Sequence, residues 1–219
     1  MEIFLKIIAV MAIGYALGMI HPSFVISQIK KANLKLKGTK NYGASNTFLV
    51  VGKMWGVLVA LLDIGKGALA TLIPMWIFPG ISYLQYLGGA MAVVGHIYPF
   101  YLKFDGGKGF AAYVGMVFAI NWQFGLIMLP IVVVLTFVIN YMITSTMTVI
   151  FTFPIFVAAY CRDWIGFVIV ILTSALIFYK HIPNFKKIKT GEEAKLSALF
   201  NKKKDPPQEN PPQDNQDSE

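Results

Sequence analysis

Three glycines surround one lysine at Gly106, Gly107, Lys108 and Gly109, directly before an apolar stretch. Glycine lets a backbone approach a ligand closely, and the N-terminus of a helix that begins there carries a partial positive charge. The lysine adds a full charge. This pattern favours a phosphate-binding loop, although it lacks the GxxxxGK[ST] spacing of a P-loop. A flexible loop whose lysine reaches the membrane surface is the alternative.

The segment 38–46 has the sequence Gly-Thr-Lys-Asn-Tyr-Gly-Ala-Ser-Asn, which combines small residues, hydroxyls and amides with a lysine. Such a segment can offer backbone N–H groups and side-chain donors to an anion. A plain linker between two helices explains the same composition, so the residues alone leave both interpretations open.

A histidine and an amide follow the last apolar stretch, in the sequence Lys180-His181-Ile182-Pro183-Asn184. His181 could act as a general acid or base or bind a phosphate, because imidazole titrates near neutral pH. A histidine at the membrane interface with no chemical role is the alternative. Pro183 should end the last helix, since proline removes a helical hydrogen bond.

Asp63 and Lys66 lie three residues apart inside an apolar stretch. Charges inside a membrane are costly and are often functional. At this spacing on a helix the two side chains can pair. The preferred interpretation is a buried structural pair that fixes the rotation of the helix.

No strong nucleophile and base occur together in the sequence. There is no GxSxG motif and no HxxxxD motif, and His96 and Asp105 are nine residues apart. The polar segments supply cations, amides and backbone donors. They favour a site that binds anions at the membrane surface and leaves the reactivity to the substrate.

The chain of 219 residues is too apolar for a water-soluble domain, with 56% hydrophobic residues, 14% charged residues and a mean hydropathy of +0.62. Soluble domains are nearer a quarter charged. This excludes a cytosolic enzyme, a nucleic-acid-binding domain and a disordered chain. The net charge of +8 comes from lysines that flank the apolar stretches, which indicates contact with anionic lipid headgroups. One cysteine, Cys161, excludes a disulfide framework, and no Cys/His cluster suggests a metal.

The apolar stretches predict an all-α, polytopic membrane protein with about seven transmembrane helices. The first stretch follows Glu2 rather than a basic start, so we interpret it as a retained helix and not a signal peptide. The fourth is too short to cross alone unless the glycine-rich loop before it also lies at membrane depth, beside a protein-lined cavity. The predicted spans are 3–20, 55–78, 83–102, 110–120, 124–140, 144–160 and 164–179.

Lysine placement orients these spans. The segment between the first two spans and the segment after the last are both rich in lysine, so both should be cytoplasmic. The N-terminus is then outside and the C-terminus in the cytoplasm. Residues 1–200 form the predicted membrane domain. Residues 201–219, mostly proline, amide and charged residues, should be a disordered cytoplasmic tail.

Four groups of residues resemble, in order and spacing, the acyl-phosphate-dependent glycerol-3-phosphate acyltransferases, the small bacterial membrane enzymes called PlsY. The family motifs are GSGNxGATNxxRxxG, DxxKG, GHxxPxFxxFxGGKG and RHxxNxxxxxxGxE, and the resemblance covers residues 18–195. The matching residues are Asn41, Gly43, Ala44, Asn46 and Gly52, then Asp63, Lys66 and Gly67, then Gly95, His96, Pro99, Phe104 and residues 106–109, and finally His181, Asn184, Gly191 and Glu193.

The resemblance implies an enzyme of the bacterial inner membrane whose site faces the cytoplasm. It would move a fatty acyl group from acyl-phosphate to the sn-1 hydroxyl of glycerol 3-phosphate, giving lysophosphatidic acid and phosphate. No metal or cofactor is implied. A mixed anhydride is already activated, so the site needs to hold two phosphates and stabilise charge.

The resemblance also implies roles for individual residues. The catalytic residues would be Lys108, His181 and Asn184. The donor phosphate would contact Gly106, Gly107, Lys108, Gly109 and Thr146, and the acceptor would contact Thr39, Asn41, Ser45 and Asn46. Lys40, where the family has glycine, is a further acceptor-binding candidate from its charge alone. The supporting residues would be Asp63, Lys66, His96 and Glu193.

Several positions depart from the family pattern. Leu49 replaces its arginine, Ala112 a threonine and Ile143 a serine. If the chain is helical from residue 50 onward, Lys53 shares a face with Leu49 and could supply the missing charge, together with Lys40. Contact of both lysines with lipid headgroups is the alternative.

Two other functions compete with the acyltransferase. A repurposed or catalytically impaired family member would bind acyl-phosphate or lipid without turnover. A transporter or channel would use the glycine-rich loop as a re-entrant pore loop, but few buried charges and no internal repeat argue against it.

Overall fold

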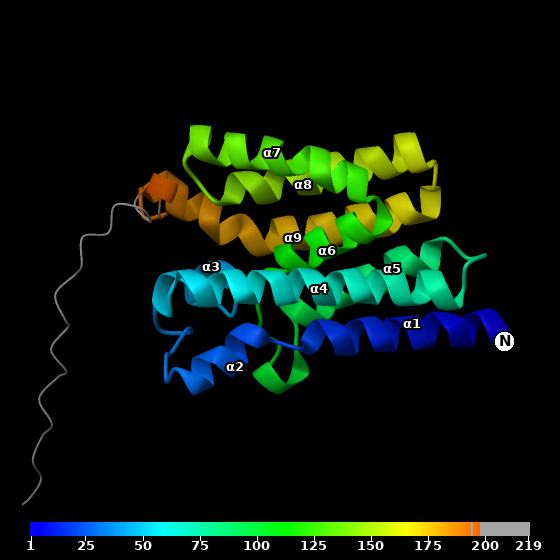
Figure 1. Ribbon diagram of the computed structural model, residues 1–219, viewed down its shortest axis with the longest axis horizontal. Coiled ribbons are helices and arrows are strands. Elements are labelled where there is room, and N and C mark those ends of the chain that lie inside the picture. The colour runs from blue at the N-terminus through cyan, green and yellow to red at the C-terminus, as the bar shows by residue number, and fades with distance from the viewer. Residues whose placement is uncertain (194, 198–219) are drawn as a thin grey trace, which may run out of the picture.

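The computed structural model describes residues 1–193 and 195–197, and helices make up the regular structure of this part of the chain (Figure 1). The predicted all-α fold is therefore confirmed. The predicted tail at 201–219 lies outside the described residues. The helices are α1 (Glu2–Met19), α2 (Pro22–Ile29), α3 (Ala44–Val50), α4 (Lys53–Ile77), α5 (Tyr83–Ile97), α6 (Phe110–Ile120), α7 (Trp122–Ile139), α8 (Ile143–Phe156) and α9 (Trp164–Thr190).

Five helical segments of the described chain are long and apolar enough to cross a membrane. The glycine-flanked helix α6 has only 11 residues and α5 has 15, so neither matches the length of a full crossing by itself. The total of seven crossings stays a prediction. The five segments are Glu2–Ile29, Lys53–Ile77, Trp122–Ile139, Ile143–Cys161 and Trp164–Thr190.

The helices form two groups that meet where α5 packs on α9 and where α6 packs on α7 (Figure 1). In one group α1 packs on α5, and α4 packs on α5 and α6; in the other, α8 packs on α7 and α9. A side chain at Gly67 would overlap the carbonyl of Ala112, and one at Gly115 would overlap that of Ile64. Small residues of this kind let membrane helices approach closely. They hold the start of α6 directly against α4.

The best-buried part of the core lies between α6, α8 and α9. Tyr113 and Phe153 are both fully buried, with their rings edge to face at 5.8 Å between centroids. The Tyr113 hydroxyl is 2.6 Å from the Ser174 hydroxyl of α9. This bond satisfies a polar group that would otherwise be costly to bury. The core therefore fixes α6 relative to α9, which carry the two halves of the site described below.

The prediction that Pro183 ends the last helix was wrong, because α9 continues to Thr190. Proline removes one hydrogen bond, and membrane helices tolerate this loss where neighbouring groups compensate. Pro183 is on the exposed side of α9, whereas His181 and Asn184 are buried. The unbroken helix places these two side chains on the same face.

The loop between α5 and α6 is longer than predicted, since α5 ends at Ile97 and not near residue 102. Pro99 follows the C-cap Tyr98, and Phe100–Leu102 form a short 3-10 turn. Helices α2 and α3 were not predicted; both lie in the segment between the first two predicted spans. These short helices bring segment 38–46 back toward α6.

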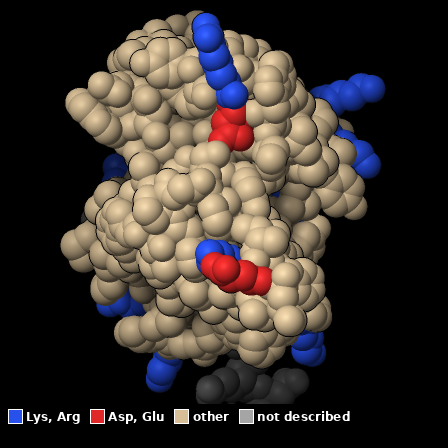
Figure 2. Space-filling model, turned by 90° about the vertical axis from the view of Figure 1, so that its right-hand side faces the viewer, with Lys and Arg blue, Asp and Glu red and all other residues tan. Residues whose placement is uncertain are grey.

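The two ends of the bundle differ in charge. Segment 30–40 and the end of α9, both rich in lysine, lie at one end, and the N-terminus lies at the other (Figure 1). Figure 2 shows the N-terminal end, which is mostly uncharged with acidic and basic groups side by side. Glu2, for example, is paired with Lys6. The asymmetry agrees with a cytoplasmic lysine-rich end, and the orientation stays a prediction.

Candidate functional site

Lys108 is joined to α9 by a chain of hydrogen bonds. Its ammonium donates to Asn184 Oδ1, and Asn184 Nδ2 donates to Glu193 Oε1 at 2.6 Å. The turn at Gly191, with φ of 77°, reverses the chain after α9 and returns Glu193 to Asn184. The carboxylate thus fixes the orientation of the amide, and the amide oxygen faces the lysine. The structure thus links Lys108 to Glu193, which lies 85 positions later in the sequence, through Asn184.

His181 lies one turn before Asn184 on the same buried face of α9. Its Nδ1 is 2.8 Å from the Ile177 carbonyl oxygen. A carbonyl can only accept, so Nδ1 carries the proton and Nε2 is left with the lone pair. The imidazole is therefore held in the tautomer that can accept a proton or a hydrogen bond at Nε2.

The glycine-rich loop leads into α6 as expected, but two of its N–H groups are already used. Gly106 N donates to Ile97 O and Gly107 N donates to His96 O, each at 3.1 Å. Gly109 is the N-cap of α6, with φ of 86° and no side-chain cap bond. The anion-binding potential of this segment therefore lies at the uncapped first turn of α6, after Lys108.

The first two glycines have a packing role that the sequence did not reveal. A Cβ at Gly107 would overlap Nε2 of His96 and lie 2.8 Å from the Tyr42 carbonyl oxygen. A Cβ at Gly106 would overlap the carbonyl oxygen of His96. Glycine is required at these two positions because the loop packs closely against other parts of the protein. The loop lies between α5 and segment 38–46.

The ammonium of Lys108 loses its proton at lower pH than an ordinary lysine does. Burial lowers the pKa of its ammonium to about 8; the Glu193 carboxylate opposes this shift, and the nearby charges of Lys187 and Lys180 add to it. Three cations and one carboxylate therefore surround the start of α6. A dianionic phosphate would complement this excess of positive charge.

Segment 38–46 is held in place largely by its own amides. Asn46 is fully buried; its Oδ1 accepts from Thr39 N at 2.7 Å, and its Nδ2 donates to Leu34 O at 2.7 Å and Asn41 O at 2.9 Å. Asn41 Nδ2 donates to the Thr39 hydroxyl at 3.0 Å. These bonds show a structural use of Asn46, whose assignment to the acceptor stays a prediction.

Other predicted ligands are placed less tightly. Lys40 and Ser45 are exposed beside this segment, and Thr146 is buried on α8. Their contacts with either substrate stay predictions.

The prediction that Lys53 shares a helical face with Leu49 was wrong. α3 ends at Val50, and Gly52, with φ of 133°, separates it from α4, which begins at Lys53. A side chain at Gly56 would overlap Phe48, so the two helices fold against each other and do not continue as one. A shared helical face cannot link residues 49 and 53, and a role for Lys53 in the acceptor site stays an untested prediction.

The predicted pair of Asp63 and Lys66 is confirmed at 2.7 Å, with both side chains buried. Lys66 Nζ also donates to Ile20 O at 2.6 Å, where α1 ends. Asp63 Oδ1 is 3.4 Å from His96 Nδ1. The sequence analysis missed His21, whose ring lies 4.6 Å from that of His96. A histidine between two apolar stretches, directly before a proline, was the available signal.

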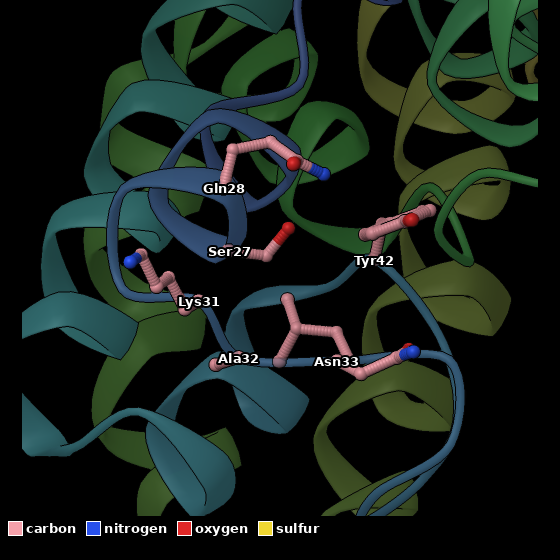
Figure 3. Close-up of a pocket in the computed structure, with 7 residues that line it drawn as sticks. Ser27, Gln28, Lys31, Ala32, Asn33 and Tyr42 are labelled. Carbon is pink, nitrogen blue, oxygen red and sulfur yellow. The ribbon is translucent and has the colours of Figure 1, made fainter. Parts of the chain in front are cut away.

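A hollow of about 230 Å³ adjoins the site without containing Lys108 (Figure 3). The Ser27 hydroxyl points into it, with Gln28 and Tyr42 at its sides (Figure 3). Lys35 borders this region, with its Nζ 2.6 Å from Asp105 and 4.9 Å from the centroid of the Tyr42 ring. Tyr42 thus lines the hollow with its side chain and packs against Gly107 with its carbonyl oxygen.

Comparison with known proteins identifies the family. The family model described as glycerol-3-phosphate acyltransferase matches residues 8–191. The chain belongs to the glycerol-3-phosphate acyltransferase family. It is 36% identical to glycerol-3-phosphate acyltransferase 1 of Oceanobacillus iheyensis, with 87% of this chain and 95% of that protein covered. It is 33% identical to the glycerol-3-phosphate acyltransferase of Enterococcus faecalis, covering 91% and 96%.

Solved structures agree with this membership. The glycerol 3-phosphate form of PlsY (YgiH), an integral membrane glycerol 3-phosphate acyltransferase, superposes with a TM-score of 0.83 at 30% identity, covering 89% of this chain and 97% of that one. Its lysophosphatidic acid form gives 0.77. The chain is therefore an all-helical integral membrane protein of a bacterial acyltransferase family, and the resemblance read from its four motifs is confirmed.

Proposed function

We propose that the protein transfers a fatty acyl group from acyl-phosphate to the sn-1 hydroxyl of glycerol 3-phosphate, giving lysophosphatidic acid and inorganic phosphate. The observation that carries the proposal is the hydrogen-bonded chain from Glu193 through Asn184 to Lys108, at the uncapped start of α6. The relatives named glycerol-3-phosphate acyltransferase support the acceptor and the reaction class. We place the reaction at the cytoplasmic side of the bacterial inner membrane.

The proposed reaction needs positioning more than a strong base. The sn-1 oxygen attacks the acyl carbon, a C–O ester bond forms, and the bond from the acyl carbon to the phosphate oxygen breaks. The hydroxyl proton goes to the departing phosphate, so no other reactant is required. Lys108 offsets the charge that grows on the phosphate, and Asn184 holds the ammonium in place. His181 Nε2 can accept a hydrogen bond from the attacking hydroxyl.

A repurposed member that binds substrate without turnover is the second candidate, and Leu49 favours it. The apolar side chain stands where the family has arginine, and the break at Gly52 removes the simplest replacement. Acceptor affinity is the property that this change should affect. A direct assay separates the two candidates.

The experiment uses the purified full-length protein in detergent or nanodiscs, with palmitoyl-phosphate and labelled glycerol 3-phosphate. Labelled lysophosphatidic acid is expected from the wild type and from Lys186→Ala, which removes an exposed lysine of α9. Lys108→Ala should lose at least about ten-fold in turnover, the value of one charged hydrogen bond. Product from palmitoyl-CoA but not from palmitoyl-phosphate would contradict the donor. No product with donors of several chain lengths would favour the repurposed member.

A further inference from the structure

Two buried imidazoles lie beneath the glycine-rich loop. His21 is the N-cap of α2 and His96 belongs to the last turn of α5. Their side chains are 2% and 3% exposed, and their ring planes are inclined by 37°. Segments 75 residues apart in the sequence thus meet as a ring pair inside the bundle.

The two rings pack against Gly106 and Gly107 of the loop. His21 Nε2 would lie 3.0 Å from a Cβ at Gly106, and His96 Nε2 would overlap a Cβ at Gly107. The loop is also tied to α5 by the N–H groups of these two glycines. Lys108 follows Gly107 directly in the chain, so a displacement of the two rings would also displace the backbone of Lys108.

The pair is itself anchored by charge. Asp63 contacts His96 Nδ1, and Lys66 bridges Asp63 to the carbonyl oxygen of Ile20, the residue before His21. His21 has an extended backbone, with φ of −109° and ψ of 93°, which separates α1 from α2 and turns the residue into the bundle. Contacts through Lys66, Asp63 and His96 therefore connect the C-terminal end of α1 to the glycine-rich loop.

His21 forms none of the hydrogen bonds that usually explain a buried histidine. Neither ring nitrogen makes a well-aligned hydrogen bond among the described residues, although the backbone of His96 lies close enough to interact with the ring. Buried polar groups without partners are rare and costly, so simple stabilisation of the fold does not account for this side chain. The contacts of His21 with His96 and Gly106 are therefore the observations that can explain why an imidazole is buried at this position.

We propose that His21 is a positioning residue for Lys108, acting through Gly106 and His96 to fix the glycine-rich loop against α6 and α9. The inference rests on the proposed function, because it assigns His21 to the acyl transfer site. A flat ring of this size supports the loop. Alanine would leave a space below Gly106, and the larger ring of phenylalanine would push the loop outward.

The test compares His21→Ala and His21→Phe with Ser23→Ala. Ser23 is fully buried in the first turn of the same helix and also has an unpaired hydroxyl, so it controls for disturbance of α2. In both His21 variants kcat should fall about ten-fold or more, because small displacements of a catalytic group are expensive. The KM for glycerol 3-phosphate and the melting temperature should stay close to those of Ser23→Ala. A folded His21 variant with the kcat of Ser23→Ala would overturn the proposal.

A second measurement does not depend on turnover. The pH dependence of competitive amine labelling at Lys108, followed by mass spectrometry, reports the state of its ammonium in the folded protein. The His21 variants should shift the labelling midpoint, since a displaced loop changes the burial of Lys108, and Ser23→Ala should not. A shift in a protein that shows no acyl transfer would refute the proposed function and keep the positioning role. An unshifted midpoint would overturn the positioning role whatever the activity.

Discussion

The charge on Lys108 should set an upper pH limit on the reaction. Burial lowers the pKa of its ammonium from 10.5 to about 8. Lysine is charged below its pKa, so the proposed phosphate contact is complete at lower pH and is lost as the pH rises through this value. Each pH unit above the pKa reduces the charged fraction about ten-fold. At about pH 9 only roughly a tenth of the molecules would carry the charge, and kcat/KM should have fallen by the same factor.

The assay measures kcat/KM for glycerol 3-phosphate over the range from about pH 6.5 to 9.5, with saturating palmitoyl-phosphate. A phosphate monoester has its second pKa near 6, so the acceptor keeps one charge state over most of this range. Spontaneous hydrolysis of the donor is subtracted at each pH. The matched variant is Lys108→Arg, which stays charged throughout. It should be slower than the wild type, because the broad guanidinium replaces a compact ammonium, but its profile should lack the descending limb.

Two results would refute this reasoning. A wild-type profile that stays flat to about pH 9.5 would show that the lysine charge is not needed or that substrate keeps it protonated. A descending limb that persists in Lys108→Arg would assign the limit to another group. Either result would show that loss of the Lys108 charge does not set the upper pH limit of the reaction.

Four further predictions follow from particular contacts. Glu193→Gln removes the carboxylate that holds Asn184 and favours the charge on Lys108, so kcat should fall about ten-fold and the descending limb should move to lower pH. Asp63→Asn leaves Lys66 buried without its partner and should lower the free energy of unfolding by about 3–5 kcal/mol, measured by denaturation in detergent. In intact cells, Cys161 should react with an impermeant maleimide; protection until lysis would reverse the orientation. Leu49→Arg should lower the KM for glycerol 3-phosphate about ten-fold, by adding one charged contact.

The sequence predicted the helical class and the pairing of Asp63 with Lys66, because both depend on local chemistry. Apolar length defines a membrane helix whatever surrounds it. The pair of Asp63 and Lys66 follows from their spacing on one helix, and the structure confirms it. Glycine followed by an apolar stretch predicted the start of α6 at Phe110, as observed.

The sequence did not predict features that depend on contacts between distant segments. Pro183 breaks a local rule, yet α9 continues to Thr190, and the next residue, Asn184, is buried and bonded to Lys108. Glycines at 106 and 107 were assigned to phosphate contact, whereas His96 and Tyr42 are what press against them. Which neighbour fills the space at a glycine is decided by the packing, so spacing alone could not separate the two explanations.

The source of charge for the acceptor phosphate shows the same dependence on distant segments. Leu49 and Lys53 are close in sequence, but Gly52 assigns them to different helices. Lys180 and Lys187 are far from Leu49 in sequence, yet both act on the charge of Lys108 from α9. If Leu49→Arg leaves the acceptor KM unchanged, these two lysines become the candidates for the positive charge that binds the acceptor phosphate. If it lowers KM sharply, α9 serves the donor phosphate alone, and the acceptor site of this chain lacks its clamp.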